Sequence, residues 1–558
     1  MIDSANKILP TVLLLTVICF IANGQTNVSG FISANTTWNL AGSPYIVVGN
    51  ALVSHGYTLT IDPGVTVKFN ADKALQIDGE LIAIGTPVNR ITFTSNQPNP
   101  SPGDWAKVHF ADTCVSAVFD SSGNYVSGCI MKYCDVLYGG GLGFGEIHIV
   151  NSFPYFSHCN ILNSASSGIY LSGSTYLIDS SVIKDCVESG LYFSNYFYYG
   201  CGLVIQGDTF EHNGCGITFD SPHQPCLHYI KNNYFYLNTG GAIFTPSGLG
   251  NIKITENEFM SNSGSTISGL LGADIECNKF LNNQTGNGVV IEMYLPYDSG
   301  IIANNLFDGN SSSFFVADIT VGYYNPMYFI NNILKDNLSL SGICRFSNLV
   351  LTDQQLLKIH HNDFSDNEAN EIINIVGDNN NANLNFVYMK FNNFQDPNSQ
   401  YELYNSIPYG APDIYADGNY WGTTNTQHID SVIYDYFDFA NQSVVYYLPV
   451  LSEAVVIDST CSPIQTGINN LDILSINSGI VLYPNPVSED LNLQLQDKND
   501  KISELSVTNT LGQKVAEQKV KGNDAGKITV TLKSLPPGVY FLRVETEKKI
   551  LTGKIIKE

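Results

Sequence analysis

Basic residues are scarce in this chain of 558 residues, with 26 Lys and Arg against 51 Asp and Glu and a formal net charge of −25. Residues 479–558 hold 12 of these basic residues with 10 acidic ones, whereas the rest of the chain carries 14 basic against 41 acidic residues. A surface of that sign repels nucleic acid and anionic lipid, so we expect no nucleic-acid partner. It would hold an acidic polysaccharide only through a bridging cation.

Long apolar runs are also scarce, and the clearest one lies at the N-terminus. Lys7 is followed by the apolar run 8–21 and by the small residues 22–24. Fourteen residues are too few to cross a bilayer as a helix. The pattern is typical of a secretory signal peptide over residues 1–24 with cleavage before Gln25, and we expect no transmembrane segment in the mature chain.

The twelve cysteines become eleven if the signal peptide is removed with Cys19, so at least one thiol must stay unpaired. A secreted chain permits disulfides. Cys114 and Cys129 flank a loop-like stretch and are the predicted bridge. Cys134 and Cys159 share one position of the repeat described next, which predicts stacked thiols in a core. The remaining pairing stays open.

A frame of the form Asn-x-Phe-x-x-Asn recurs, as in "ENEFMSNSGSTI" at residues 256–267. Its first Asn falls at positions 233, 257, 278, 305, 332, 362, 392 and 419, and weaker copies extend it back to Asp208, Ser181, Cys159 and Cys134. The mean interval of about 26 residues is the period of a solenoid. The segments are short, rich in β-formers and punctuated by Gly, Asn and Ser, which favours a β-helix over leucine-rich repeats.

In a β-helix the coils stack at the strand spacing of about 4.8 Å. We expect Phe259 and its equivalents to point inward as a stacked core. Asn257 and its equivalents are predicted to lie at the turn, where Asn tolerates a left-handed backbone, and to bond to one another in a ladder. These asparagines therefore serve the fold and not catalysis.

The chain resembles right-handed parallel β-helix proteins of the pectin-lyase-like class. The resemblance rests on the opening "LTIDPGVTVKF" and "LQIDGELIAIGT", on "GDWAKVHF", and on the closing "ADGNYWGTTNTQHIDSVIYDYFD". It predicts an all-β fold with a β-helix over residues 25–451, closed at its end by Trp421 and the aromatic residues around it. Relatives of this class include lyases, hydrolases, epimerases, adhesins and phage spikes, so the fold does not define a function.

A different pattern follows a predicted linker at 452–478. Residues 479–558 alternate like the strands of a small β-sandwich. They resemble the type A C-terminal sorting domain of the type IX secretion system of Bacteroidota. The matching residues are Tyr483, Pro484, Asn485, Pro486, Gly512, Gly538, Tyr540, Gly553 and Lys554. The resemblance implies recognition by the outer-membrane translocon of that system, export through the periplasm, and removal of the tail with attachment at the cell surface or release.

Several signatures of polysaccharide-cleaving β-helices are missing. The hydrolase relatives carry Asp pairs and a Gly-His-Gly, and neither Asp-Asp nor Gly-His-Gly occurs in this sequence. The lyase relatives place an Arg or Lys base beside carboxylates that bind Ca²⁺. None of the few basic residues before the tail falls in such a motif. The sequence therefore favours a glycan-binding or adhesion protein, with a polysaccharide lyase or glycoside hydrolase as the alternative.

One outward-facing set of residues could carry a site. Alternation along the strands predicts an outward column of Ser172, Ser194, Asp220, Thr245, Glu292 and Asp318. Glu292 and Asp318 would lie on neighbouring coils about 5 Å apart, which suits a shared Ca²⁺ or the carboxylate pair of a retaining glycosidase. Tyr170 and Tyr192 begin the preceding column and could stack on sugar rings. An acidic and aromatic strand face without a ligand is the other interpretation.

Overall fold

In a computed structural model, two compact units divide the chain, Met1–Pro463 and Ile464–Glu558. The structure describes residues 24–557 apart from the stretches 121–122, 174–175, 195–202, 221–226, 296–298, 322–325, 350–355, 378–385, 411–412, 458–460, 462–479, 484–486, 488, 496–501, 510–513, 520–526, 534, 537 and 547–549. Most of the predicted signal peptide and linker therefore lies outside the described residues.

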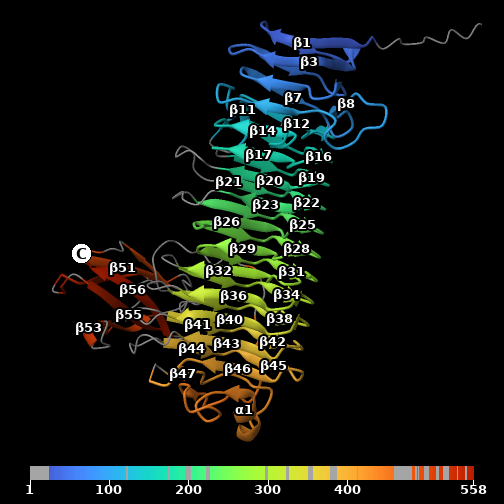
Figure 1. The fold of residues 1–558 in the computed structure, drawn as a ribbon. Helices are drawn as coiled ribbons and strands as arrows, with labels where there is room; N and C mark the ends of the chain where they lie inside the picture. The colour runs from blue at the N-terminus through green and yellow to red at the C-terminus, as the bar shows by residue number, and fades with distance from the viewer. Residues whose placement is uncertain are drawn as a thin grey trace, which may run out of the picture. The chain divides into compact units, whose positions relative to one another are not determined.

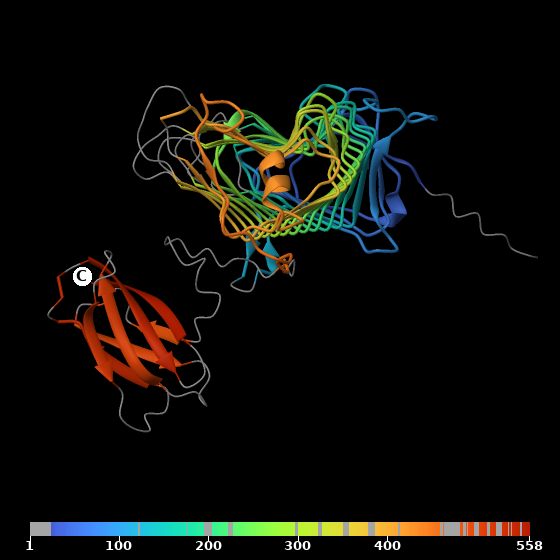
Figure 2. The same cartoon turned by 90° about the horizontal axis from the view of Figure 1, so that it is seen from below.

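The first unit is a parallel β-helix, as predicted. Each coil contributes one strand to each of three faces, here numbered in chain order, and every pairing between coils is parallel. Figure 1 shows the coils stacked along one axis, and the view along that axis in Figure 2 shows them superposed. The faces meet at turns rich in Asn and Gly.

Face 1 is a sheet of 16 strands. They are β2 (Thr36–Trp38), β4 (Thr58–Ile61), β7 (Glu80–Ile84), β12 (Ile130–Lys132), β15 (Tyr155–Ser157), β18 (Tyr176–Asp179), β21 (Leu203–Gln206), β24 (His228–Lys231), β27 (Ile252–Thr255), β30 (Ala273–Glu276), β33 (Gly300–Ala303), β37 (Met327–Ile330), β41 (Leu356–His360), β44 (Phe386–Lys390), β47 (Ile414–Tyr415) and β49 (Val445–Tyr446).

Face 2 follows the first turn of each coil. Its strands are β5 (Thr66–Phe69), β8 (Ile91–Ser95), β13 (Cys134–Leu137), β16 (Asn160–Leu162), β19 (Val182–Lys184), β22 (Thr209–Glu211), β25 (Tyr234–Tyr236), β28 (Glu258–Met260), β31 (Lys279–Leu281), β34 (Leu306–Asp308), β38 (Ile333–Lys335), β42 (Asp363–Ser365) and β45 (Asn393–Gln395).

Face 3 completes each coil. Its strands are β6 (Ala74–Ile77), β9 (Lys107–Phe110), β14 (Ile147–Val150), β17 (Ile169–Ser172), β20 (Ser189–Ser194), β23 (Cys215–Phe219), β26 (Ile243–Leu249), β29 (Ile267–Leu270), β32 (Ile291–Leu295), β36 (Phe315–Val321), β40 (Gly342–Leu349), β43 (Glu371–Gly377), β46 (Tyr401–Ser406) and β48 (Ile433–Tyr434).

A few elements lie outside these series. The first strands β1 (Thr26–Ile32) and β3 (Tyr45–Val53) pair with each other, and β3 also pairs with both β5 and β6. The others are the 3₁₀ turn η1 (Leu40–Gly42), the hairpin β10 (Val118–Phe119) and β11 (Tyr125–Ser127), the short strands β35 (Ser311–Ser312) and β39 (Leu338–Ser339), and the helix α1 (Thr426–Val432).

The recurrent frame builds two asparagine ladders, one at each end of the face 2 strand. The first ladder is Asp208, Asn233, Asn257, Asn278, Asn305, Asn332, Asn362, Asn392 and Asn419. The second is Asn213, Asn238, Asn262, Asn283, Asn310, Asn337, Asn367 and Asp396. In each step the Oδ1 of one residue accepts from the backbone N–H of the residue above and, except where that residue is Asp208, from its side-chain amide. The predicted ladder is thus confirmed, and a second one accompanies it.

The predicted backbone conformation of the ladder asparagines is wrong. The residue before each of them adopts the left-handed region, as at Glu256 (φ +58°) and Cys277 (φ +59°). Asn257 and Asn278 themselves are buried, and their amides bond inside the turn. The reason is that the Asn257 amide makes buried bonds to three other residues, which contribute more to the turn than relief of backbone strain at the preceding position.

Aromatic rings fill the interior between the ladders. Phe210, Phe235, Phe259, Phe280 and Phe307 stack in one column with ring centroids 4.7 to 5.0 Å apart. The column ends in Phe364, Phe394 and Trp421, also stacked. Trp421 and Ile429 of α1 are both buried, so this region closes the last coil, as predicted.

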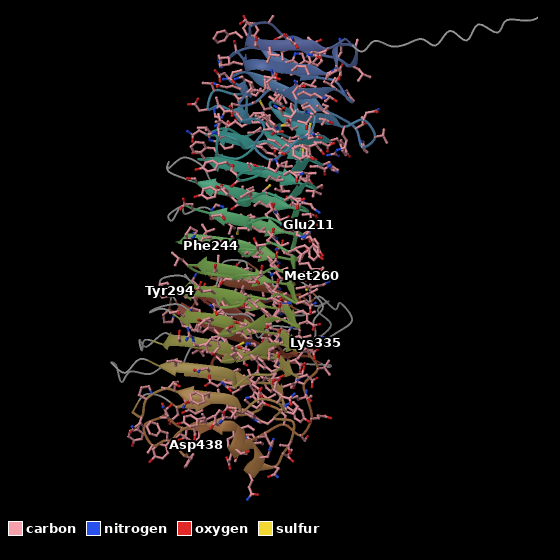
Figure 3. The ribbon with its side chains drawn as sticks, turned by 45° about the vertical axis from the view of Figure 1, so that its right-hand side comes forward. Glu211, Phe244, Met260, Tyr294, Lys335 and Asp438 are labelled. Atoms are coloured by element: carbon pink, nitrogen blue, oxygen red, sulfur yellow. The ribbon has the colours of Figure 1, made fainter. Side chains whose placement is uncertain are left out.

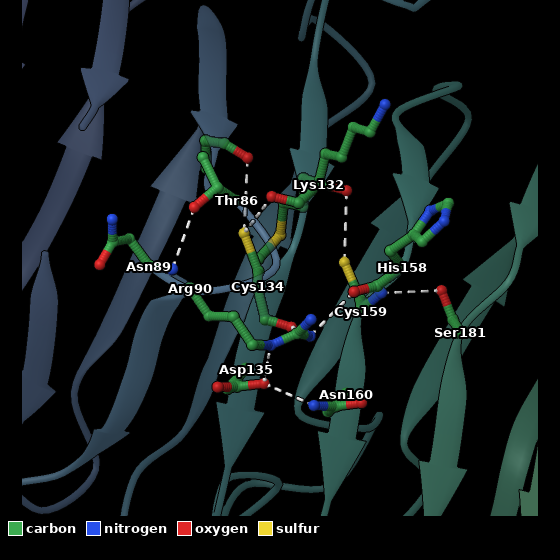
Figure 4. A network of polar contacts seen from close by, with 12 residues as sticks. Thr86, Asn89, Arg90, Lys132, Cys134, Asp135, His158, Cys159, Asn160 and Ser181 are labelled. Atoms are coloured by element: carbon green, nitrogen blue, oxygen red, sulfur yellow. Dashed lines mark hydrogen bonds and ion pairs between the residues drawn. The ribbon is translucent and has the colours of Figure 1, made fainter. Parts of the chain in front are cut away.

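The coils before Asp208 use smaller residues at the position of the first ladder. Cys159 N donates to Ser181 Oγ at 3.1 Å, and the Cys134 and Cys159 thiols are buried, as predicted. Arg90 joins these coils through bonds to Asp135 Oδ1 (2.7 Å) and to the carbonyl of Cys134 (2.9 Å) (Figure 4). Here the coils are held together by a charged side chain instead of amides.

The second unit has two antiparallel sheets around its own core. One sheet contains β50 (Ile480–Tyr483), β51 (Asp490–Leu495) and β54 (Lys527–Thr531). The other contains β53 (Lys514–Lys519), β52 (Ile502–Asn509), β55 (Gly538–Thr546) and β56 (Ile550–Lys557). Leu493, Leu505 and Leu542 are among the buried residues that both sheets contribute. The tail is thus a small β-sandwich.

Candidate functional site on face 3

One column of outward residues runs along face 3. Successive pairings place in it His109, His148, Tyr170, Tyr192, Thr218, Phe244, Ser268, Glu292, Asp318, Arg345, Asn374 and Tyr404. Glu292 and Asp318 are adjacent, as predicted. The predicted column that joined them to Ser172, Ser194 and Asp220 is wrong. The pairings between coils align Ile291 with Ile169, so Glu292 belongs to the column of Tyr170.

The strand β26 departs most from the predicted alignment. Ile217 pairs with Ile243, so Phe244 faces outward and Thr245 is buried, the reverse of the prediction. The register then shifts between Phe244 and Leu249, which is a bulge in the face. Gly269 on the next coil has φ +80°, and a Cβ there would lie 2.1 Å from the carbonyl oxygen of Thr245. Only glycine allows this close approach of the two backbones.

These irregular strands border a pocket of about 380 Å³. Its lining residues are Thr245, Pro246, Gly248, Gly269, Leu270, Leu271, Glu292, Met293, Tyr294, Asp318, Thr320 and Arg345. The bulge supplies the apolar side and the regular strands β32, β36 and β40 supply the polar side. The two carboxylates predicted from the sequence therefore lie in one pocket, together with a guanidinium that sequence reasoning missed.

Arg345 holds the carboxylate of Asp318. Its Nε donates to Asp318 Oδ1 at 2.8 Å and its Nη2 to Asp318 Oδ2 at 2.5 Å. The guanidinium also lies 4.8 Å from the centroid of the Phe315 ring. Paired and stacked in this way, Arg345 is a fixed donor in the pocket wall. Glu292 is exposed on the coil above, and no described residue bonds to its carboxylate.

Two aromatic side chains stand beside the pocket. Phe244 and Tyr294 are 41% and 40% exposed. Both project from the same edge of the coil stack in Figure 3. They are two coils apart, or about 10 Å along the axis.

Tyr170 and Tyr192 lie higher on the same column but have little free ring face. Their rings stack on each other with centroids 5.0 Å apart and planes at 10°. His148 and Phe144 meet the edge and face of Tyr170 on its other side. Tyr192 Oη donates to Asp220 Oδ2 at 2.5 Å, so Asp220 lies in the adjacent outward column and bonds to this one. The rings offer edges and hydroxyls to a ligand more than flat faces.

The end of the column nearest the N-terminus carries two histidines, His109 and His148. Their rings lie 4.7 Å apart, and Lys107 Nζ is 3.2 Å from His148 Nδ1. Burial first, and then Lys107 and His109, lower the pKa of His148 to about 3. Burial also lowers the pKa of His109. Both imidazoles are therefore neutral at pH 7, and Arg345 is the cation that this column presents near the pocket.

The calcium site predicted from the sequence has few protein ligands in the pocket. Among the described residues there is no group of three or more His, Cys, Asp or Glu that could hold a metal ion. Asp318 already receives two bonds from Arg345. Calcium at Glu292 and Asp318 would require ligand oxygens from the bound molecule, and it stays a prediction.

The predicted sorting residues lie in the second unit. Tyr483 ends β50, and Gly538 begins β55 opposite Lys557. Tyr540 is buried and donates to the carbonyl of Pro536 at 2.9 Å. Gly553 and Lys554 lie in β56, opposite Leu542 and Phe541. Pro484, Asn485, Pro486 and Gly512 lie outside the described residues.

Comparisons with known families match both units. Residues 481–558 match the family described as the secretion system C-terminal sorting domain. Residues 112–268 match the family described as periplasmic copper-binding protein (NosD). Within the described ranges, no helix combines the length and apolar character needed to cross a membrane.

Individual proteins resemble this chain either at low sequence identity or over a short stretch. A mutant of the periplasmic alginate epimerase AlgG is 12% identical, with 75% of this chain and 84% of that chain covered and a TM-score of 0.27. A tailspike protein of E. coli bacteriophage HK620 is 12% identical, with 95% and 84% covered and a TM-score of 0.24. Protein bark beetle of Drosophila melanogaster is 47% identical over 53 residues, which are 10% of this chain and 2% of that protein. The chain thus spans a small fraction of this curated relative.

The stacked coils and ladders define a parallel β-helix protein. More particularly, it is a β-helix protein that carries the C-terminal sorting domain of the type IX secretion system. Such a tail directs the chain to the translocon of that system, and so to the outer surface or the medium.

Proposed function

We propose that this protein binds a polysaccharide on face 3, as a glycan-binding or adhesion protein outside the cell. The observation that carries the proposal is the pocket of about 380 Å³ with Glu292, Asp318 and Arg345 in its wall. Exposed rings stand next to it at Phe244 and Tyr294. Carboxylates and a fixed guanidinium bond to sugar hydroxyls, while the rings stack on the apolar faces of the sugars.

The charge of the pocket favours neutral or amino sugars over uronic acids. Arg345 balances Asp318, whereas Glu292 adds an uncompensated negative charge. Outside the tail the chain has 41 acidic against 14 basic residues, so the surrounding potential is also negative. A polyuronate would need Ca²⁺ between its carboxylates and Glu292. Calcium-dependent binding of acidic chains is therefore the second arm of the test.

Polysaccharide cleavage is the alternative function. Neighbouring strands place Glu292 and Asp318 about 4.8 Å apart, near the separation of about 5–5.5 Å in retaining glycosidases. However, Arg345 donates to both Asp318 oxygens, and this stabilisation of the carboxylate makes it a weaker nucleophile. The pair therefore supports binding over catalysis.

The experiment compares retention of the mature protein on immobilised neutral, amino and uronic polysaccharides, with Ca²⁺ or with EDTA. We expect retention on a neutral or amino glycan without release of reducing or unsaturated ends. Replacing Tyr294 by Ala should weaken binding about tenfold, since loss of a stacking ring costs about 1 kcal/mol or more. The matched control is Tyr229→Ala, because Tyr229 is also 40% exposed but lies on face 1.

Three results would contradict this proposal. Equal loss of binding in the two tyrosine variants would place the site elsewhere. Retention on no glycan would remove the function altogether. Release of new chain ends that disappears in Glu292→Gln would establish the enzyme instead.

A further inference from the structure

The chain after the last coil turns back along the β-helix. Leu451 N donates to the carbonyl of Asn419 at 2.9 Å, which holds the start of this segment at the final coil. Val455 then forms two bonds with the side chain of Asn393, at 2.8 and 2.9 Å. Cys461 Sγ lies 3.8 Å from the carbonyl oxygen of Asn304. Residues 451–461 are here called the return segment, and its described residues, 451–457 and Cys461, contact successively earlier coils.

The length of the return segment fits this path. Between Asn393 and Asn304 the first ladder steps through Asn362 and Asn332, so the two levels are three coils apart. Three coils span about 14 Å at the spacing of paired strands. The six residues from Val455 to Cys461 can reach about 20 Å. The thiol of Cys461 therefore arrives at this level without strain.

A second thiol lies where the return segment arrives. Cys277 occupies the left-handed turn position one coil above Asn304, and its N–H bonds to the carbonyl of Ala303. Because Cys461 contacts Asn304, it lies on the coil next to Cys277, and both thiols are free in this structure. Cys277 is buried and Cys461 is exposed. Burial, with Cys461 next in importance, raises the pKa of the Cys277 thiol, so Cys461 is the more accessible of the two for chemistry.

We propose that Cys277 and Cys461 form a disulfide that fastens the return segment to the β-helix. The oxidant is the disulfide of a thiol–disulfide oxidoreductase met during export. Deprotonated Cys461 attacks that disulfide, which forms a mixed disulfide and releases one thiolate of the catalyst. Deprotonated Cys277 then attacks the Cys461 sulfur and releases the second thiolate. Two thiols have lost two protons and two electrons, and the catalyst leaves as a dithiol.

The bond has a consequence for the tail. Without it, the return segment is attached covalently at the final coil and is held against earlier coils by hydrogen bonds such as those of Val455. With it, the covalent attachment of the residues beyond Cys461 moves from the final coil to the level of Cys277. Removal of the sorting unit after Cys461 would then leave the return segment in place on the mature protein.

The test uses the exported full chain, alkylated without reduction, digested and analysed by mass spectrometry. We expect one linked peptide pair that contains Cys277 and Cys461 and that disappears after dithiothreitol. Cys461→Ser should abolish the linked pair and lower the melting temperature. Because Cys461 is exposed, a packing defect would not explain that lower temperature. Val456→Ser, at a residue that is 90% exposed in the return segment, is the control and should change neither property.

The double variant makes the assignment specific. The double variant Cys277→Ser, Cys461→Ser should have the same melting temperature as Cys461→Ser alone. The melting temperature of the wild-type protein in reductant should fall to the same value. The proposal is overturned if both cysteines are recovered alkylated in exported, unreduced protein. It is equally overturned if Cys461 is found linked to another cysteine or to a second copy of the chain.

Discussion

At the scale of single residues, two ladder ends hold Asp in place of Asn, and they show what the amide contributes to a coil. Asn367 Nδ2 donates to the carbonyl of Leu334, and every ladder asparagine from Asn233 onward has such a bond to a backbone carbonyl of the coil above. Asp396 and Asp208 occupy ladder positions but lack the second donor, and the Oδ2 of each is buried without a partner. Burial raises the pKa of both carboxyls, and that of Asp396 to about 6. Only the protonated carboxyl can imitate the amide.

Replacing Asp396 by Asn should therefore stabilise the β-helix near neutral pH. The pKa of Asp396 in the folded state lies above its ordinary value of 3.8, so its stabilising protonated form is complete below pH 4 and is lost as pH rises through about 6. Asn supplies the donor at every pH. We expect a gain on the order of 2 kcal/mol at pH 7.5 and little change at pH 4, measured by denaturant unfolding.

Asp336→Asn is the control, since Asp336 is exposed at a left-handed turn and its replacement should shift stability equally little at both pH values. Two acidic groups face Asp396: the charge of Asp363 raises its pKa, whereas a hydrogen bond with Glu402 lowers it. A pH-independent effect of Asp396→Asn would refute the account.

At the scale of elements, the ladders join one coil to the next. Asn332 Oδ1 accepts from the backbone and side chain of Asn305 at 3.1 and 3.0 Å, while its own amide donates to the carbonyl of Ile302 at 2.8 Å. All these groups are buried, so none can exchange its lost partner for water. The turn between face 1 and face 2 therefore depends on one side chain per coil.

Asn332→Ala should cost about 3 kcal/mol or more, because two buried donors and two buried acceptors each lose a partner. The measurement is the shift of the unfolding midpoint. Asn370→Ala is the matched control, since Asn370 makes a single exposed bond to the carbonyl of Leu340 and its loss should cost less than about 1 kcal/mol. Similar costs for the two variants would mean that the ladder contributes no more than a surface bond.

At the scale of the whole molecule, the two units have separate cores. The core of the β-helix ends with the cap at Trp421 and Ile429, and the core of the tail is made by its own two sheets. The long edge strand β56 pairs with β55 over eight residues. We therefore expect the tail to fold by itself around β55 and the β-helix to fold without it.

Deletion of residues 480–558 should leave a β-helix with the parent's circular dichroism and a cooperative melt, but it should block export and cause accumulation in the periplasm. Truncation from Gly553 should block export as well, because it removes half of β56 from its sheet. Protease shaving of intact cells measures delivery. Normal surface exposure of the deleted protein would contradict the sorting function of the tail.

Much of this architecture can be predicted from local sequence. The Asn-x-Phe-x-x-Asn frame identifies a stacked solenoid because the ladders and the phenylalanine column impose the same residue at each turn. The spaced tail motifs likewise identify the sorting unit. Even the adjacency of Glu292 and Asp318 follows from the coil length.

The pocket depended on the register between coils, which alternation leaves open. A slip of two residues keeps every side chain on the same side of its strand, so Glu292 could be assigned to the column of Asp220 when it belongs with Tyr170. A slip of one residue reverses the sides, and the predicted alignment made this slip at β26, where the pairing of Ile217 with Ile243 turns Phe244 outward and buries Thr245. Arg345 reaches Asp318 only after these registers are set. Local patterns therefore specify the coil, whereas the hydrogen bonds between coils decide which side chains share a site.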